Sequence, residues 1–170
     1  MEVAGLRLLH LALGMFWAGG TVLLGFWVVP SVVAAGPAGG AVMRGMVVDR
    51  KLPQVMTVSG ILTILTGLRL YQLRFSTAWL TTTEGIVLTL AGLIAIGGLA
   101  IGLFAQRPTA ARLSALGETI ARAGGPPTPE QVQEMGRLQA KLLRTGKLLG
   151  AHVGTAALLM AALRLAQALS

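Results

Sequence analysis

Apolar residues along the chain gather into four long runs separated by shorter polar segments. The runs cover residues 8–35, 52–71, 86–104 and 148–168. Each holds about 20 residues or more, enough for a helix to cross a hydrocarbon layer about 30 Å thick. Because backbone amides find no water in lipid, such segments must be helical. The pattern predicts an all-α, polytopic membrane protein in which residues 1–170 form one membrane four-helix bundle.

The polar segment between the third and fourth runs, residues 107–147, is expected to form a helical hairpin. Glycines and prolines at residues 124–127 interrupt it. Thr128, Pro129 and Gln131 then match a helix start: Thr caps the helix, Pro takes the first position, and Gln closes a capping box. No proline follows, so one continuous helix should run from this point into the fourth run. The hairpin therefore extends the fourth span beyond the membrane.

Composition agrees with a membrane protein and narrows the chemistry. Hydrophobic residues make up 54% of the chain and charged residues 12%, against about 25% charged residues in a soluble domain. The chain has no cysteine, which excludes disulfides, cysteine-ligated zinc, iron–sulfur clusters and a thiol nucleophile.

The fourteen Lys and Arg residues are distributed unevenly over the connections. Ten lie between runs 1 and 2 or between runs 3 and 4: Arg44, Arg50, Lys51, Arg107, Arg112, Arg122, Arg137, Lys141, Arg144 and Lys147. Positive residues favour the cytoplasmic side. This bias predicts a bacterial-type inner (plasma) membrane protein with a cytoplasmic hairpin and both termini outside. The net charge of +8 then indicates contact with anionic lipid headgroups of the bilayer, and not with nucleic acid.

Glycines recur every fourth residue in two of the runs. They are Gly98 and Gly102 in the third run, and Gly146, Gly150 and Gly154 at the start of the fourth. Such ridges of small residues let helix backbones approach closely. The pattern predicts tight packing between helices of one chain; a homo-oligomer or a partner in a membrane complex is the second interpretation.

His10 is the first candidate for chemistry, because ionisable groups are costly to keep in a membrane. His10, Gly14 and Trp17 share one helix face. A neutral imidazole with a glycine one turn away could ligate the iron of haem b. In the alternative interpretation His10 is bonded to a nearby carbonyl. His152 should lie about 20 Å from His10 along the membrane normal, so the two histidines are not expected to share one iron.

Arg7, Arg69 and Glu84 fall together near the outer ends of their runs. An ion pair between Arg69 and Glu84 would lower the cost of both charges, and with Arg7 it would line a small polar pocket. The sequence contains no carboxylate pair, phosphate loop, HExxH motif or serine triad, so no enzyme activity is predicted.

The first ninety residues resemble a known group of membrane proteins. Residues 9–20, together with Pro30 further along the first run, carry a His-x6-Trp-x-Gly…Pro pattern similar to the first helix of the HemJ-type protoporphyrinogen oxidases and the CopD copper-resistance proteins. Residues 56–68 resemble the second helix of that group, and Trp79-Leu80 falls where the third begins. The resemblance implies a helical bundle in which His10 binds haem or a metal.

Two positions depart from the oxidase pattern. Ser31 follows the proline where the HemJ family has Arg, and Thr82, Thr83 and Glu84 stand where it has Lys. The resemblance therefore does not extend to oxidase activity.

Three functions follow from these patterns. The first is a small integral inner-membrane protein of this bundle type with a non-catalytic or accessory role. The second is a b-type haem or metal-binding redox protein that uses His10. The third is a copper-handling or transport protein, for which Met43 and Met46 are the only closely spaced soft ligands.

Overall fold

In the computed structural model, which describes residues 2–169, the chain is all-helical and contains no strand within that range. Its elements in chain order are α1 (Glu2–Leu23), the π-helical turn η1 (Leu24–Val28), α2 (Val29–Ala34), α3 (Pro37–Arg44), the π-helical turn η2 (Gly45–Asp49), α4 (Leu52–Gln72), α5 (Thr77–Leu80), α6 (Thr83–Ile101), the π-helical turn η3 (Gly102–Gln106), α7 (Arg107–Ala123) and α8 (Pro129–Leu169).

Three continuous helices are long and apolar enough to cross a membrane: Glu2–Ala34, Thr83–Ala123 and Pro129–Leu169. A fourth candidate consists of Ala38–Asp49 and Leu52–Gln72, which meet at a bend of 51°. Within the most apolar stretch of the three continuous helices, only 22%, 17% and 17% of the residues are buried inside the protein. Apolar surface on this scale needs lipid or a partner to cover it.

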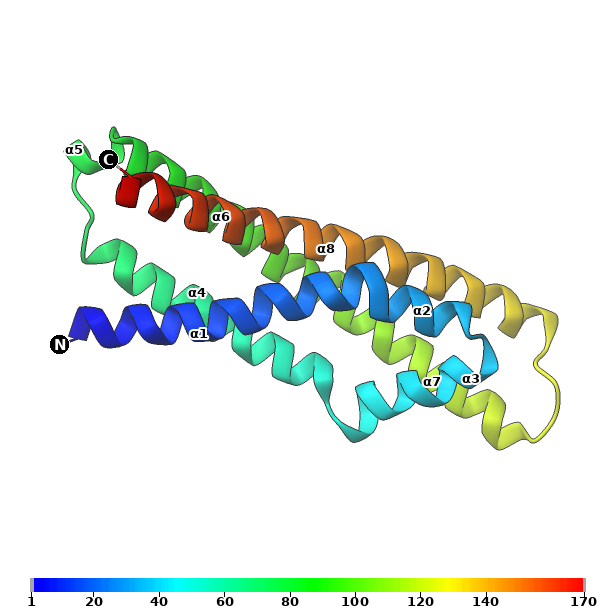
Figure 1. Cartoon of the computed structure of the whole chain (residues 1–170). Helices are drawn as coiled ribbons and strands as arrows, with labels where there is room; N and C mark the ends of the chain where they lie inside the picture. Colours follow the sequence, from blue (N-terminus) through cyan, green and yellow to red (C-terminus); the bar gives the residue numbers. More distant parts are fainter. Residues whose placement is uncertain (1, 170) are drawn as a thin grey trace.

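The long helices run side by side, with both termini at one end and the α7–α8 connection at the other (Figure 1). The closest pairs are α6 with α8, α1 with α4, and α1 with α8, whereas α4 and α6 touch much less. The ring of helices is therefore loosest between α4 and α6.

Glycines allow α1 and α8 to cross closely. A side chain at Gly25 would run into the carbonyl group of Gly146, whose carbon lies 2.9 Å from the position of the added Cβ. Gly150 faces the Thr21 carbonyl in the same crossing, at 3.2 Å. The small-residue ridge predicted on α8 is thus used for packing within the chain, and its partner Gly25 was not part of the predicted set.

The other glycines of the predicted ridges divide into two groups. Gly98 is a tight contact, because an added Cβ would lie 2.7 Å from Val153 of α8, and Gly154 approaches Val22 at 3.1 Å. Gly102 is not a tight contact, because an added Cβ would lie 3.8 Å from its nearest neighbour, Leu149, which is an ordinary contact distance. The prediction of a close crossing at Gly102 is therefore wrong; its missing side chain leaves space instead.

The predicted long helix is confirmed as the 41-residue α8. At its start the backbone N–H of Thr128 donates to Gln131 Oε1 at 2.9 Å, and the N–H of Gln131 donates to Thr128 Oγ1 at 3.3 Å. The backbone amide of Glu130 and the Thr128 hydroxyl lower the pKa of the Glu130 carboxyl, as expected at the positive end of a helix. The sequence-predicted capping box is therefore formed.

The first half of α8 packs against α7, so the two form a helical hairpin. Leu113 of α7 meets Leu138 and Leu142 of α8 in a buried cluster that Val29 and Met43 join from the first half of the chain. A second cluster, around Trp17 and Val153, lies between the long helices. The hairpin is therefore anchored on the bundle through α2 and α3.

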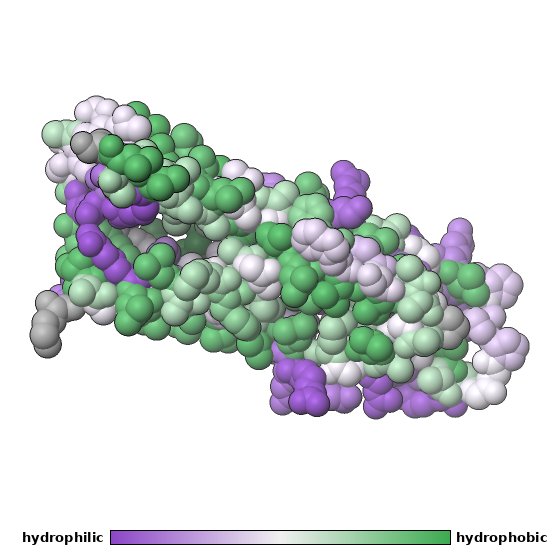
Figure 2. All heavy atoms as spheres, in the orientation of Figure 1, coloured by the Kyte–Doolittle hydropathy of each residue, from purple (hydrophilic) through white to green (hydrophobic). Residues whose placement is uncertain are grey.

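Surface character changes along the molecule. On the face shown in Figure 2, hydrophobic residues cover the middle and the half near the termini. Hydrophilic residues gather around the α3–α7 end and in a hollow beside the termini. Such a band of apolar surface between two polar ends fits a bilayer whose normal follows the long axis.

Candidate functional site: a cavity lined by three π-helical turns

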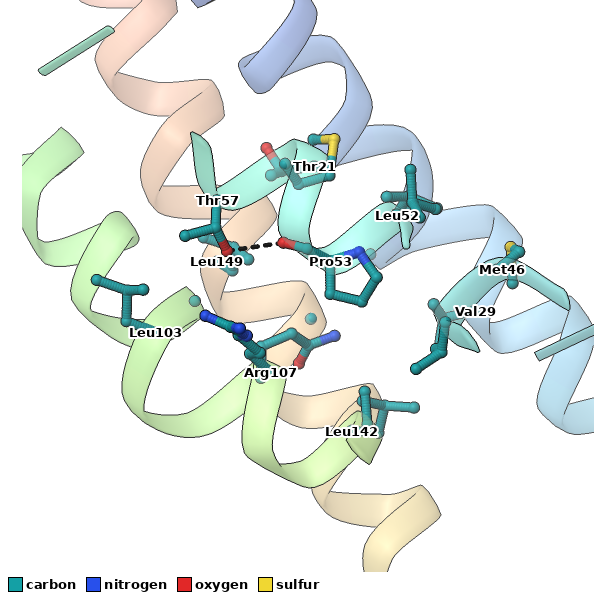
Figure 3. A pocket seen from close by; sticks show the side chains of 18 of the residues that line it. Thr21, Val29, Met46, Leu52, Pro53, Thr57, Leu103, Arg107, Leu142 and Leu149 are labelled. Carbon is teal, nitrogen blue, oxygen red and sulfur yellow. Dashed lines mark hydrogen bonds between the residues drawn. The ribbon is translucent and has the colours of Figure 1, made fainter. Parts of the chain in front are cut away.

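A cavity lies in the half of the bundle nearer the α7–α8 connection, where α4 and α6 separate. It encloses about 110 Å³ and is partly open to the outside. Its walls include Leu52 and Pro53 at the start of α4 on one side, and Leu103 and Arg107 on the other (Figure 3). Because α4 makes almost no contact with η3, no helix–helix packing closes this gap.

All three π-helical turns of the described chain contribute to the wall. η1 provides Leu24 and Gly25, η2 provides Met46 and Val47, and η3 provides Gly102, Leu103 and Gln106. A π-helical turn widens a helix locally and leaves one backbone group out of the regular ladder, and such turns occur frequently at functional sites. Three of them, from three segments far apart in sequence, meet at one cavity.

The lining is apolar, and its hydroxyl groups are already bonded. Thr21 Oγ1 donates to the carbonyls of Trp17 and Ala18, at 2.9 and 3.0 Å. Thr57 Oγ1 donates to the Pro53 carbonyl at 2.7 Å (Figure 3). These hydroxyls bond to carbonyls of their own helices, and neither has a basic side chain as its hydrogen-bond partner. The wall can therefore hold an apolar group but offers little for acid–base chemistry.

Three of the seven methionines line this cavity: Met43, Met46 and Met56. Thioether side chains are flexible and polarizable, so they adapt to apolar groups of different shape. The fold brings Met56 of α4 to the same wall as the Met43–Met46 pair, which spacing along the chain did not indicate.

Besides the two threonines, the polar side chains of the lining are Gln106 and Arg107. The Thr145 hydroxyl donates to Gln106 Oε1, which fixes the Gln106 amide against α8. Arg107 is exposed and lies at the edge of the cavity. Among the described residues no carboxylate comes within 4.0 Å of its guanidinium. The cavity thus combines an apolar interior with one unpaired cation at its edge.

The face of α1 that carries His10, Gly14 and Trp17 packs against α4. His10 Nδ1 donates to the Thr63 carbonyl at 2.9 Å. Thr63 Cγ2 lies 3.5 Å from the position that a Cβ would take at Gly14. The Trp17 indole lies 2.8 Å from the corresponding Cβ position at Gly60. The space beside Gly14 that a macrocycle would need is therefore filled by α4. The predicted haem site on this face does not fit the structure.

The second histidine belongs to a different helix pair. His152 Nδ1 donates to the Leu148 carbonyl of its own helix at 2.8 Å and lies over Gly97 and Gly98 of α6. His10 instead lies over Gly67 of α4. Within residues 2–169, no three His, Cys, Asp or Glu side chains gather as metal ligands would.

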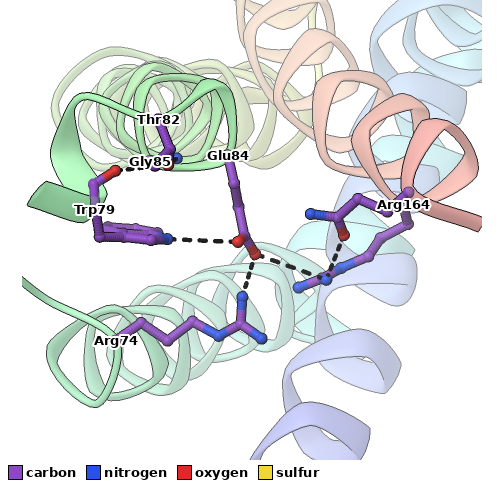
Figure 4. A network of polar contacts seen from close by, with 7 residues as sticks. Arg74, Trp79, Thr82, Glu84, Gly85 and Arg164 are labelled. Atoms are coloured by element: carbon purple, nitrogen blue, oxygen red, sulfur yellow. Dashed lines mark hydrogen bonds and ion pairs between the residues drawn. The ribbon is translucent and has the colours of Figure 1, made fainter. Parts of the chain in front are cut away.

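The polar cluster near the termini has a different composition from the one predicted. One carboxylate oxygen of Glu84, Oε1, pairs with Arg74 and lies 3.8 Å from Arg164 (Figure 4). Trp79 Nε1 donates to the other oxygen of Glu84, Oε2, at 3.4 Å. The predicted Arg69–Glu84 pair is wrong, because Arg69 pairs with Glu2 of α1 at 3.1 Å.

Helix geometry explains the exchange of partners. Arg69 lies one turn after Thr66, on the face of α4 that packs against α1, and so it meets the start of α1. Arg74 lies beyond the end of α4, where the chain has already turned toward α6. Arg7 is exposed on α1. The predicted pocket of Arg7, Arg69 and Glu84 is therefore two separate contacts.

Neither the cavity nor the Glu84 cluster was found by sequence reasoning. Arg74, Arg107 and Arg164 entered the sequence argument only through the distribution of basic residues, which does not indicate their contacts. The π-helical turns were not predicted from the sequence. The one available signal was the glycine at position 102, which was assigned to helix packing.

No protein-family model matches this chain, and neither a curated protein nor a solved structure is similar to it.

Proposed function

We propose that the chain is a four-span inner-membrane protein that binds an apolar molecule from the bilayer in the cavity between α4 and α6. The convergence of the three π-helical turns on one apolar, partly open cavity carries this proposal. The helix lengths and the exposed apolar band support the membrane setting. The apolar wall, whose threonine hydroxyls bond to backbone carbonyls, favours a role in binding.

The four spans are the helical segment Glu2–Ala34, the bent pair that ends at Gln72, the α6–α7 helix and the second half of α8. The termini lie outside and the α7–α8 hairpin lies in the cytoplasm, because ten of the fourteen basic residues belong to the hairpin side. The cavity then lies near the cytoplasmic interface of the membrane.

Cysteine labelling tests this orientation in a chain that has no cysteine of its own. Ala121 on α7 and Ala78 on α5 are both exposed and lie at opposite ends of the molecule. In intact cells an impermeant thiol reagent should label Ala78→Cys but label Ala121→Cys only after the membrane is opened. The reverse pattern would show that the hairpin is outside.

Trp17 offers a direct probe of the cavity, because it lines the wall and is only 4% exposed. Replacement of Trp27 and Trp79 by phenylalanine leaves Trp17 as the only tryptophan of the chain. In vesicles whose lipids carry bromine on the acyl chains, Trp17 fluorescence should be quenched, because bromine quenches at close range. A ligand that enters the cavity would bring the bromine there.

Gly102→Leu provides the matched control. Its new side chain would grow into the cavity, since the nearest atom to an added Cβ is 3.8 Å away. This variant should lose most of the Trp17 quenching. In a second single-tryptophan form, which keeps Trp27 and carries phenylalanine at positions 17 and 79, the 60% exposed Trp27 should be quenched by the surrounding lipid with or without Gly102→Leu. Equal Trp17 quenching with and without Gly102→Leu would mean that no lipid group occupies the cavity.

A further inference from the structure

From the charge at the edge of the cavity we infer that the bound molecule is an anionic phospholipid, with one acyl chain in the cavity and its phosphate against Arg107. This inference rests on the proposed binding function and adds the chemical class of the ligand.

The size of the cavity limits what its interior can hold. An apolar cavity of about 150 Å³ takes up benzene, so the 110 Å³ enclosed here fits a short stretch of one hydrocarbon chain. The rest of a two-chain lipid would remain in the bilayer outside the gap between α4 and η3. A membrane lipid meets this condition, because only part of it has to leave its normal environment.

Arg107 supplies the anion-binding group. Its guanidinium lies among the residues of the wall beside Leu103 (Figure 3), and no described carboxylate neutralises it. A guanidinium presents paired N–H groups that match two phosphate oxygens. Near a membrane interface an unpaired cation is most stable next to an anionic headgroup.

The opposite side of the gap carries the same sign of charge. Arg50 and Lys51 immediately precede Leu52 and Pro53, which form that wall. Lys51 has a left-handed backbone, with φ of 50°, and it ends the bend between η2 and α4. With Asp49 included, the segment that leads into this wall carries one net positive charge. This charge has the sign that an anionic amphiphile complements.

The test uses the single-tryptophan protein in vesicles made of equal amounts of phosphatidylglycerol and phosphatidylcholine. In one preparation the phosphatidylglycerol chains carry bromine, and in the other the phosphatidylcholine chains carry it. Surface charge and composition are then identical, so the difference in Trp17 quenching reports which lipid occupies the cavity. Brominated phosphatidylglycerol should occupy it about fivefold more, the ratio that one interfacial cation provides.

Two variants assign the preference to a residue. Arg107→Gln should bring the two lipids to equal quenching, whereas Arg112→Gln, which removes the same charge from the next turns of α7 outside the cavity wall, should keep the preference. A loss of preference in Arg112→Gln would overturn the assignment to Arg107. The comparison of the two lipids on the single-tryptophan protein needs no substitution at Arg107, so it decides the question even if Arg107→Gln does not fold.

The possible failures are distinguishable. Equal quenching of Trp17 by both brominated lipids, in the single-tryptophan protein with Arg107 intact, would overturn the headgroup preference and leave the cavity as an apolar binding site. Absence of quenching by either lipid would overturn the proposed function together with this inference.

Discussion

Alanine at Gly25 is expected to destabilise the folded bundle by roughly 3 kcal/mol, at the upper end of what overpacking a close-packed site costs. The added Cβ would collide with the Gly146 carbonyl of α8, whose carbon lies 2.9 Å away. Both sides of this contact are backbone, so the collision can be relieved only by moving η1, and with it the end of α1, away from α8. That movement would also loosen the contact between Gly150 and Thr21.

Gly19→Ala is the matched control on the same helix, because nothing lies within 4 Å of its added Cβ. Alanine favours a helix over glycine by up to about 1 kcal/mol, so this variant should keep or slightly raise the midpoint of unfolding. Gly146→Ala should fall between the two, since its Cβ would first meet the end of the Gln106 side chain, at 3.2 Å, and not the backbone.

Thermal unfolding in detergent, followed by circular dichroism, measures all three variants. The midpoint of unfolding is expected to be highest for Gly19→Ala, lower for Gly146→Ala and lowest for Gly25→Ala. A Gly25→Ala protein as stable as Gly19→Ala would show that α1 and α8 do not cross at this point.

Replacement of Glu84 by alanine is the second large effect, with an expected loss of roughly 2 kcal/mol. Glu84 joins Arg74, Trp79 and Arg164 (Figure 4), and its removal leaves two arginines close together without a carboxylate. Removing one partner of a buried ion pair costs about 3–5 kcal/mol. The value is lower here because the side chains of Arg74 and Arg164 are 35% and 52% exposed.

Glu134→Ala removes the same charge from an exposed pair with Arg137 on α8 and should leave the midpoint of thermal unfolding close to that of the unsubstituted protein, because exposed ion pairs contribute little to stability. Double-mutant cycles should give a larger coupling of Glu84 with Arg74 than with Arg164, because the Arg164 pair spans 3.8 Å. A coupling near zero for both pairs would mean that Glu84 does not hold the ends of α4, α6 and α8 together.

Helix content and the start of α8 followed from the sequence. Apolar runs of membrane length exclude strands in a bilayer for a local reason, namely that each backbone amide must bond within its own segment. The capping box at Thr128 and Gln131 is equally local, since its two hydrogen bonds join residues three apart. The uneven distribution of basic residues similarly required no knowledge of packing to predict an orientation.

Partners across the bundle were decided by the tertiary structure. Arg69 could have met either acidic residue at that end, and the rotation of α4 about its axis selects Glu2. His10 and Gly14 share one face of α1, as predicted, but Thr63 of α4 packs against that face where a cofactor was expected. A helix face that is suitable for a cofactor and one that is suitable for a neighbouring helix have the same small and apolar residues.

By itself, then, the sequence determined that the chain is all-helical with long apolar helices, where α8 begins and which glycines could form a ridge, because these properties depend on residues a few positions apart. Only the tertiary structure decided that Gly25 meets Gly146, that Glu84 meets Arg74 and Arg164, and that the three π-helical turns line one cavity. These contacts depend on the rotation and separation of whole helices, which are set by the sum of many weak packing contacts and not by a local pattern.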